Sequence, residues 1–339
     1  FPIGHLAPRL VGMDPIMWDP FRYKLGGRLL NSEGDEFVQN YGHVETSDKY
    51  TAPRDITSFA ILQEVAAGRG SPAGGAYLSF EHIPEASLRA AFGPVIDRLA
   101  ANDIDLSKRG IEVSPIAHYH MGGVRVDGHM ETGVPGLFAA GEAVGGANGA
   151  NRLSGNALSE AFVFGERAGR FAAAIIDKRV TLWSNEAARS AVDEIMAGRH
   201  SAIRQSGPGL AGMLVTLQEL MWRDVGLLRT ENKLAKALTL VQDMRRDIGD
   251  HPGASDHRFA ISMQDWFDMR NSLITAEAII AGAQTRKESR GAHQRDDFPR
   301  IDPEQTYNLI TRLDGEDLSV TKAPLVSKPF DLIPLEAAE

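Results

Sequence analysis

The spacing of apolar residues divides the chain into a mixed first part and a helical last part. Before residue 118, short apolar stretches bounded by turn residues predict strands at 27–31, 37–39, 76–80 and 111–117. Three- and four-residue spacing predicts helices at 53–69 and 84–101 in the same part. Beyond residue 176 the spacing is helical, with Gly/Pro breaks, and it predicts helices at 185–198, 209–225, 231–248 and 264–289. The predicted fold class is α+β.

Several side chains of the helical part fall on apolar positions, and we expect them in its core: Trp222, Leu227, Leu228, Leu234, Leu238 and Val241. The tail from Ile301 alternates and contains prolines, which predicts one or two peripheral strands. The stretch that ends the last helix carries Arg290, Gly291 and His293. Two interpretations stay open for it: a solvated helix end, or a contact that docks on a neighbouring domain.

A glycine-rich segment connects the two parts. Residues 136–140 predict a buried strand, residues 157–176 predict a helix, and the turn between them is rich in glycine and asparagine. A strand, a glycine-rich turn and a helix N-terminus together form an anion site, because backbone amides and the positive end of the helix dipole point outward. Glu142 and Arg152 add one charge of each sign. This segment therefore predicts a site for a polar cofactor held largely by backbone.

Further candidates lie upstream. Arg54 occupies the first turn of a predicted helix, where a cation opposes the helix dipole, so it is either paired or functional, or else an ordinary surface arginine. The predicted strand 111–117 leads directly to His118 and His120. Two histidines at this spacing could bind a metal, but no suitably spaced third ligand follows, so we expect no metal site. Asp127-Gly128 predicts a hairpin turn.

Composition narrows the function classes. The 339 residues include 43% hydrophobic residues, enough for packed cores in two or three domains. A formal charge of −9 argues against a nucleic-acid surface. The absence of cysteine excludes disulfides, thiolate metal sites and cysteine nucleophiles. The longest apolar runs are too short to span a membrane.

Three motifs resemble the succinate dehydrogenase/fumarate reductase flavoprotein family, which includes L-aspartate oxidase. They are His-Tyr-His-Met-Gly-Gly at 118–123, Val-Pro-Gly-Leu-Phe-Ala-Ala-Gly-Glu at 134–142 and Gly-Ala-Asn-Arg-Leu-Ser-Gly-Asn-Ala-Leu at 149–158. Residues 162–165, 286–293 and 297–299 are similar to it as well. The resemblance implies a capping, substrate-binding domain (1–115), the returning segment of a Rossmann-like FAD-binding domain (116–178), a helical domain (179–300) and a C-terminal tail (301–339).

The resemblance also implies roles for single residues. Arg54 would transfer a proton, and His118 and Arg152 would bind substrate carboxylates. Glu142 would bond the FAD ribose or ribityl chain, and the Ala157 and Leu158 amides would face the flavin. The rest of the expected cofactor site is Gly141, Asn151, Arg152 and Asn156. The implied reaction is hydride transfer between flavin and a dicarboxylate-like substrate, at a CH–CH or CH–NH2 bond.

The family's G-x-G-x-x-G motif, which holds the FAD pyrophosphate at the turn between a strand and a helix, does not follow any predicted strand of the sequence. We therefore expect an N-terminal FAD-binding segment to be missing and the isolated chain to be inactive. Phe1 stands where the family carries a histidine, and 13–21 is bulkier than the family's substrate loop, so the substrate stays open. Expected partners are that segment, a carboxylate substrate and an iron–sulfur or other electron-transfer subunit, with no nucleic acid. The expected location is cytoplasmic, at the membrane face through partner subunits. The alternative is a folded, non-catalytic fragment without flavin.

Overall fold

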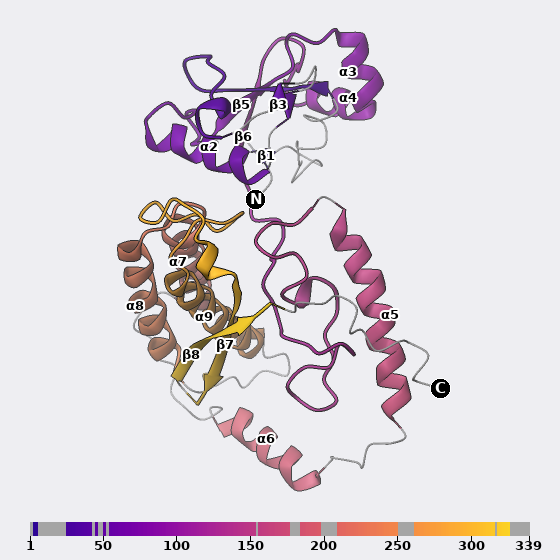
Figure 1. Ribbon diagram of the computed structural model, residues 1–339, viewed down its shortest axis with the longest axis vertical. Helices are drawn as coiled ribbons and strands as arrows, with labels where there is room; N and C mark the ends of the chain where they lie inside the picture. Colours follow the sequence, from indigo (N-terminus) through magenta and orange to yellow (C-terminus); the bar gives the residue numbers. More distant parts are fainter. Residues whose placement is uncertain are drawn as a thin grey trace. The chain divides into compact units, whose positions relative to one another are not determined.

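The computed structural model describes residues 3–5, 25–42, 45–46, 50–51, 54–153, 155–176, 184–197, 209–249, 261–315 and 317–325 (Figure 1). It divides into two compact units, Phe1–His120 and Met121–Glu339. Helix and strand both contribute, as expected for the mixed fold class. The unit boundary lies five residues after the predicted end of the capping domain, and the predicted subdivision of the second unit stays a prediction.

The first unit is built on a four-stranded antiparallel sheet in the order β1-β6-β5-β2. The strands are β1 (Ile3–His5), β6 (Ile111–Pro115), β5 (Ala76–Ser79) and β2 (Arg28–Leu30). Helix α2 (Arg54–Ala66) packs against β1, β5 and β6. The remaining elements are the paired strands β3 (Glu45–Thr46) and β4 (Tyr50–Thr51), the 3-10 helix η1 (Val38–Asn40), and the short helices α3 (Glu85–Phe92) and α4 (Pro94–Ala100).

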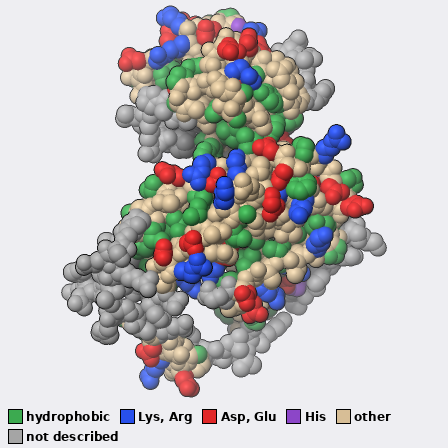
Figure 2. Space-filling model, turned by 90° about the vertical axis from the view of Figure 1, so that its left-hand side faces the viewer, with side chains coloured by type: hydrophobic (Ala, Val, Ile, Leu, Met, Phe, Trp, Pro, Cys, Tyr) green, Lys and Arg blue, Asp and Glu red, His purple; other side chains and the backbone are tan. Residues whose placement is uncertain are grey.

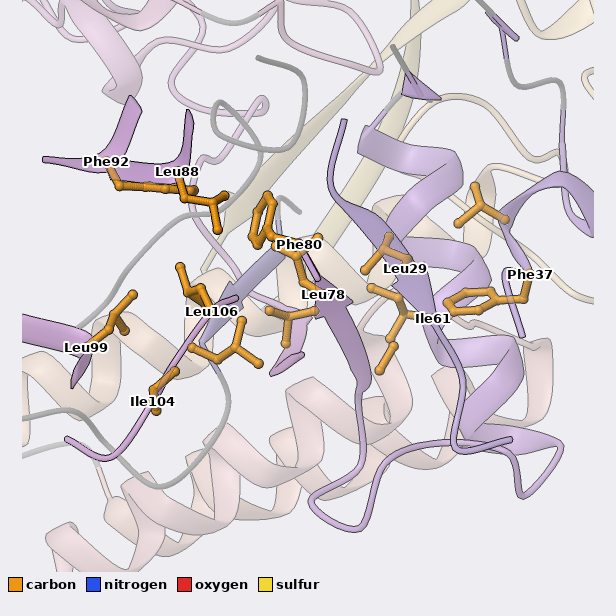
Figure 3. Packing of buried hydrophobic residues seen from close by; sticks show 14 of the residues in the cluster. Leu29, Phe37, Ile61, Leu78, Phe80, Leu88, Phe92, Leu99, Ile104 and Leu106 are labelled. Atoms are coloured by element: carbon orange, nitrogen blue, oxygen red, sulfur yellow. The ribbon is translucent and has the colours of Figure 1, made fainter. Parts of the chain in front are cut away.

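The core of the first unit lies where α2 and the short helices cover the sheet. Figure 3 shows Ile61 of α2 beside Leu29 and Leu78 of the sheet, with Phe80 beyond them. All four side chains are fully buried, as are Phe37 and Leu99 at the two ends of the cluster. Burying such side chains contributes about 1.5–3 kcal/mol each, so this cluster fixes the position of α2 on the sheet.

The second unit begins with irregular backbone and continues as helices. A 3-10 helix η2 (Gly141–Ala143) precedes the long helix α5 (Asn156–Ile176), and α6 (Asn185–Ala197) follows. Helices α7 (Leu210–Val225), α8 (Glu231–Ile248) and α9 (Ile261–Thr285) pack side by side around Leu217, Leu234 and Leu273 (Figure 1). The 3-10 helix η4 (Pro303–Gln305) leads to an exposed hairpin of β7 (Tyr307–Asp314) and β8 (Asp317–Pro324), which packs on α9.

Some predicted elements are wrong, each for a local reason. The helix predicted at 84–101 is two helices, because Gly93 has φ +53° and Pro94 begins the second. The strand predicted at 37–39 is the 3-10 helix η1, in which the consecutive residues Phe37 and Val38 are both buried. The last helix ends at Thr285 rather than 289. The predicted core strand at 136–140 pairs on one edge with residues 130–132, and Leu137 is 54% exposed.

The surface of the described residues has two general features. Acidic and basic side chains are interspersed over the face shown in Figure 2, so that face carries no large patch of one sign. Among the helices that the structure describes, none combines the length and the apolarity needed to cross a membrane.

Candidate active site

The backbone that follows the histidine motif runs beside the glycine-rich loop. The Val124 amide donates to the Ala143 carbonyl (2.7 Å), and the Gly145 amide donates to the Val124 carbonyl (3.2 Å). A Cβ atom added to Gly123 would lie 2.5 Å from the Ala143 oxygen, and one added to Gly145 would lie 2.6 Å from the Gly123 nitrogen. Because real Cβ atoms do not approach backbone so closely, both positions require glycine. The two motifs are therefore joined through main chain.

The loop then turns onto helix α5. Gly141 has φ +66°, and a Cβ atom at this position would meet the Ala161 Cα of α5 at 3.4 Å. Gly146, Gly149 and Gly155 also have positive φ, but an added Cβ would find nothing within 4 Å at any of them. The loop thus combines two closely packed glycines, Gly141 and Gly145, with three whose outer side is open. Open backbone before a helix N-terminus suits a ligand that approaches the main chain closely.

One buried acid holds the middle of the loop. Glu160 lies in the second turn of α5 with only 7% of its surface exposed. Its Oε1 accepts a hydrogen bond from Asn148 Nδ2 at 2.7 Å. Since a buried carboxylate is costly without such partners, this bond ties the loop to the helix.

The predicted cofactor residues of the second unit follow along this loop. Glu142 and Asn151 are exposed, whereas Arg152 is half-buried and its Nη1 donates to the Leu153 carbonyl at 3.1 Å. At the start of α5, the Leu158 amide donates to the Gly155 carbonyl at 3.1 Å. That internal bond makes the Leu158 amide a weaker donor toward a ligand.

The other two predicted catalytic residues belong to the first unit. Arg54 is the first residue of α2, as the sequence predicts, and is half-buried. His118 is exposed and lies three residues after the end of β6, the strand against which α2 packs. At its other end α2 is anchored by Glu64, whose carboxylate is bonded by Arg69 and Tyr41.

Comparison with known proteins identifies the family. Residues 17–158 match the FAD binding domain family, and residues 215–336 match the fumarate reductase flavoprotein C-terminal family. A subunit of the CoM/CoB fumarate reductase of Methanothermobacter marburgensis is 36% identical over 84% of the chain and 51% of its own length. The chain belongs to the succinate dehydrogenase/fumarate reductase flavoprotein family. L-aspartate oxidase of Caulobacter vibrioides is 33% identical over 86% of the chain and 48% of its own length.

Solved structures agree with this assignment. Mycobacterium smegmatis Sdh1 in complex with UQ1 superposes with a TM-score of 0.79 at 33% identity, covering 98% of the chain and 56% of Sdh1. Escherichia coli quinol fumarate reductase superposes with a TM-score of 0.79 at 26% identity, covering 97% of this chain and 60% of the matched chain. The chain spans about half the length of the curated relatives it matches.

The structure adds site residues that the sequence motifs did not single out. Glu160 was not predicted, although an acid inside an otherwise apolar helix start is a signal that could have been used. Gly123 and Gly145 were visible as parts of motifs, but only the structure shows that they contact each other. The third addition is the turn at 290–293, which contacts Ala150 within the same compact unit, so docking on a separate domain stays a prediction.

Other hollows and clusters are unrelated to the predicted residues. A hollow of about 380 Å³ beside α3 and α4 is lined by none of them. Within the described parts of the chain, no three His, Cys, Asp or Glu side chains gather closely enough to hold a metal ion.

Proposed function

We propose that this chain supplies the substrate-binding and flavin-facing parts of an FAD-dependent oxidoreductase of the fumarate reductase/succinate dehydrogenase type. The reaction is hydride transfer between FAD and a dicarboxylate-like substrate, at a CH–CH or CH–NH2 bond. The observation that carries the proposal is the loop 141–158, in which an open glycine backbone leads past Arg152 to the N-terminus of α5. The relatives named fumarate reductase and L-aspartate oxidase support the same reaction class.

The loop fits a dinucleotide cofactor by its chemistry. Gly146, Gly149 and Gly155 leave the outer side of the backbone open, and the helix N-terminus favours a polar or anionic group. Glu142 would accept hydrogen bonds from ribose or ribityl hydroxyls, and the Ala157 amide would serve the flavin edge. When bound, FAD supplies the acceptor or donor of the hydride.

The chain's own charged residues handle the substrate. Arg152 would bind a substrate carboxylate through its planar guanidinium, which offers two parallel hydrogen bonds. His118 would bind a second carboxylate or polarise the substrate. Arg54 would move the proton at the carbon next to the one that exchanges hydride. An arginine is a weak acid, so this role requires a desolvated site, which lowers the guanidinium pKa, and a carboxylate partner that returns the proton to it.

Partners follow from the same family membership. We propose an iron–sulfur or other electron-transfer subunit, because the M. marburgensis relative is named as one subunit of an enzyme and a similar M. smegmatis structure is that of an Sdh1 complex. We also propose that the FAD pyrophosphate is held outside residues 1–339, because no predicted strand of the sequence leads into G-x-G-x-x-G. The proposed location is the cytoplasmic face of the membrane, reached through partner subunits.

The test is flavin content and a half-reaction, with the protein made at the full length its gene encodes. FAD released from the purified protein is measured by absorbance, and stopped-flow absorbance follows its reduction by succinate or L-aspartate and, once reduced, its oxidation by fumarate. Arg152→Lys keeps the charge but loses the two-point contact, and it should cost about 2–4 kcal/mol of transition-state stabilisation.

The outcomes separate the proposal from its alternative. A protein that binds no FAD and reacts with none of the three acids would support the non-catalytic interpretation, which the family matches do not favour. Wild-type turnover by Arg152→Lys would show that Arg152 is structural.

A further inference from the structure

A tight turn from the end of the chain contacts the loop that carries Arg152. The Arg290 amide donates to the His293 carbonyl (2.7 Å) and the His293 amide to the Arg290 carbonyl (3.0 Å). Gly291 lies at the turn with φ +55°, a conformation that favours glycine. The turn is therefore a closed and well-defined unit.

The contact itself is backbone to backbone. The Ala292 amide donates to the Ala150 carbonyl at 2.9 Å. A Cβ atom added to Gly291 would lie 2.5 Å from the Ala150 oxygen and 2.8 Å from its carbonyl carbon. Neither atom is the end of a flexible side chain, so the loop itself would have to move. Ala150 is two residues from Arg152, and such a shift would reach the guanidinium.

A buried network of charges holds the turn in place. Glu288 is fully buried and accepts hydrogen bonds from Arg290 (2.9 Å), the Asp302 amide (2.9 Å) and Arg286 (2.7 Å). Burial alone would raise the pKa of Glu288, but these donors outweigh it and lower the pKa to about 2. The carboxylate therefore stays charged, and both arginines stay attached to it.

The imidazole of His293 ties the turn to helix α7. Its Nδ1 accepts from Arg229 Nη1 (2.8 Å), and its Nε2 donates to the Arg286 carbonyl (3.1 Å). Arginine nitrogens only donate, which fixes these roles. Arg229 also donates to the Val225 carbonyl at the end of α7 (2.9 Å). The turn thus takes its position from the helical bundle.

We propose that the turn 290–293 is a positioning element that sets where Arg152 stands, with Gly291 and Ala292 as its contact residues. Near Arg152 the loop is held by Glu160 of α5 on Asn148 and, as a second point, by this turn on Ala150. The second point makes the affinity for the substrate carboxylate depend on the helical bundle. The proposal rests on the proposed role of Arg152.

The first test measures the loop directly in the 339-residue chain. Gly291→Ala adds the clashing Cβ, and hydrogen exchange read by mass spectrometry on peptides covering 148–153 should become at least tenfold faster. The matched control is Gly315→Ala, because Gly315 has a similar φ of +61° with nothing within 4 Å of an added Cβ. Unchanged exchange at 148–153 in Gly291→Ala would overturn the proposal, as would equal acceleration in Gly315→Ala.

The second test uses the flavin-loaded enzyme at its full encoded length. Gly291→Ala should raise KM for the carboxylate substrate at least tenfold with FAD content unchanged, while Gly315→Ala stays within twofold of wild type. In an Arg152→Ala background the same Gly291→Ala change should alter KM less than twofold, because the group it positions is gone. An equal rise in both backgrounds would overturn the proposal.

Two further measurements separate failure of the proposed positioning role from failure of the proposed function and from misfolding. If Arg152→Ala alone leaves KM unchanged, the proposed function of Arg152 fails, whereas the exchange data still report on the turn. If Gly291→Ala does not fold, Gly291→Asn with Gly315→Asn as its control replaces the pair. Asparagine enters the left-handed region more readily than alanine, so the clash is kept with less backbone strain.

Discussion

Replacing Glu64 by Gln should destabilise the first unit by about 3 kcal/mol at neutral pH. The Glu64 side chain is almost fully buried and is bonded by Arg69 (2.7 and 2.8 Å), Tyr41 Oη (2.6 Å) and Asn31 Nδ2 (3.1 Å). The hydrogen bonds from Arg69, with help from Tyr41 and Asn31, outweigh burial and lower the pKa of Glu64 from 4.5 to about 2. At 1.36 kcal/mol for each tenfold change, this difference corresponds to about 3 kcal/mol.

The sign of the pH dependence follows from the same shift. The folded state binds the Glu64 proton less tightly than the unfolded chain does, so the contribution is fully present above pH 4.5. It is lost as the pH falls from 4.5 through about 2, and below that pH the carboxyl group is protonated in both states. The gap between wild type and Glu64→Gln should therefore close over this pH range.

The assay is the opening free energy of α2, read by amide hydrogen exchange on peptides covering 57–66 at several pH values. Glu33→Gln is the control, because Glu33 is an exposed acid of the same unit. A loss below about 1 kcal/mol for Glu64→Gln, or a loss that does not shrink with acid, would refute the reasoning. Because α2 begins at Arg54, a loosened α2 should also impair the proposed proton transfer.

Two further predictions concern single ionisable groups. Arg54 is half-buried, so Arg54→Ala should lower the melting temperature modestly, in line with the roughly 1 kcal/mol typical of single substitutions. It should slow the stopped-flow flavin half-reaction at least about 100-fold. A large drop in melting temperature with the reaction preserved would make Arg54 a structural residue. Burial and the neighbouring Arg229 lower the pKa of His293 to about 4, so its imidazole should stay neutral down to about that pH. An NMR titration of the histidine resonances measures this, and His293→Gln identifies the resonance of His293. Titration near the ordinary value of 6.5 would contradict the buried arrangement.

Elements with strong local signals could be predicted from the sequence. The predicted helix 231–248 has the bounds of α8, because Thr230 caps its start by accepting from the Lys233 amide and Gly249 ends it with φ +70°. The errors arose where a regular apolar spacing continued across a residue that ends a helix, or where it did not identify the buried face. The apolar spacing continues across Gly93-Pro94 and so conceals the break between the two helices. Trp222 is 45% exposed because the buried face of α7 carries Met213, Leu217 and Leu220, and Trp222 lies on a different face.

The glycine-rich loop of the candidate site could be recognised from the sequence, but the contacts that hold this loop in place could not. The loop 141–158 stands out in the sequence because so many glycines in one short segment indicate backbone that turns sharply or lies close to a ligand. Its attachment to residues 290–293 is a contact between segments about 140 residues apart, and neither segment alone encodes it. Only a structure shows that the turn at Gly291 contacts the backbone of Ala150.

Several apolar residues in and around the loop are exposed, although their spacing in the sequence predicts burial. Leu137, Leu158, Phe162 and Val163 are 54%, 69%, 76% and 57% exposed, although their pattern predicts a buried strand and helix face. Apolar atoms contribute more than half of an ordinary protein surface, so an apolar pattern does not by itself place a side chain in the core. Burying a side chain of this size contributes about 1.5–3 kcal/mol. The prediction of a buried core strand at 136–140 is therefore wrong for the described residues, and the exposure of Leu158, Phe162 and Val163 shows that apolar spacing alone does not locate the buried face of α5.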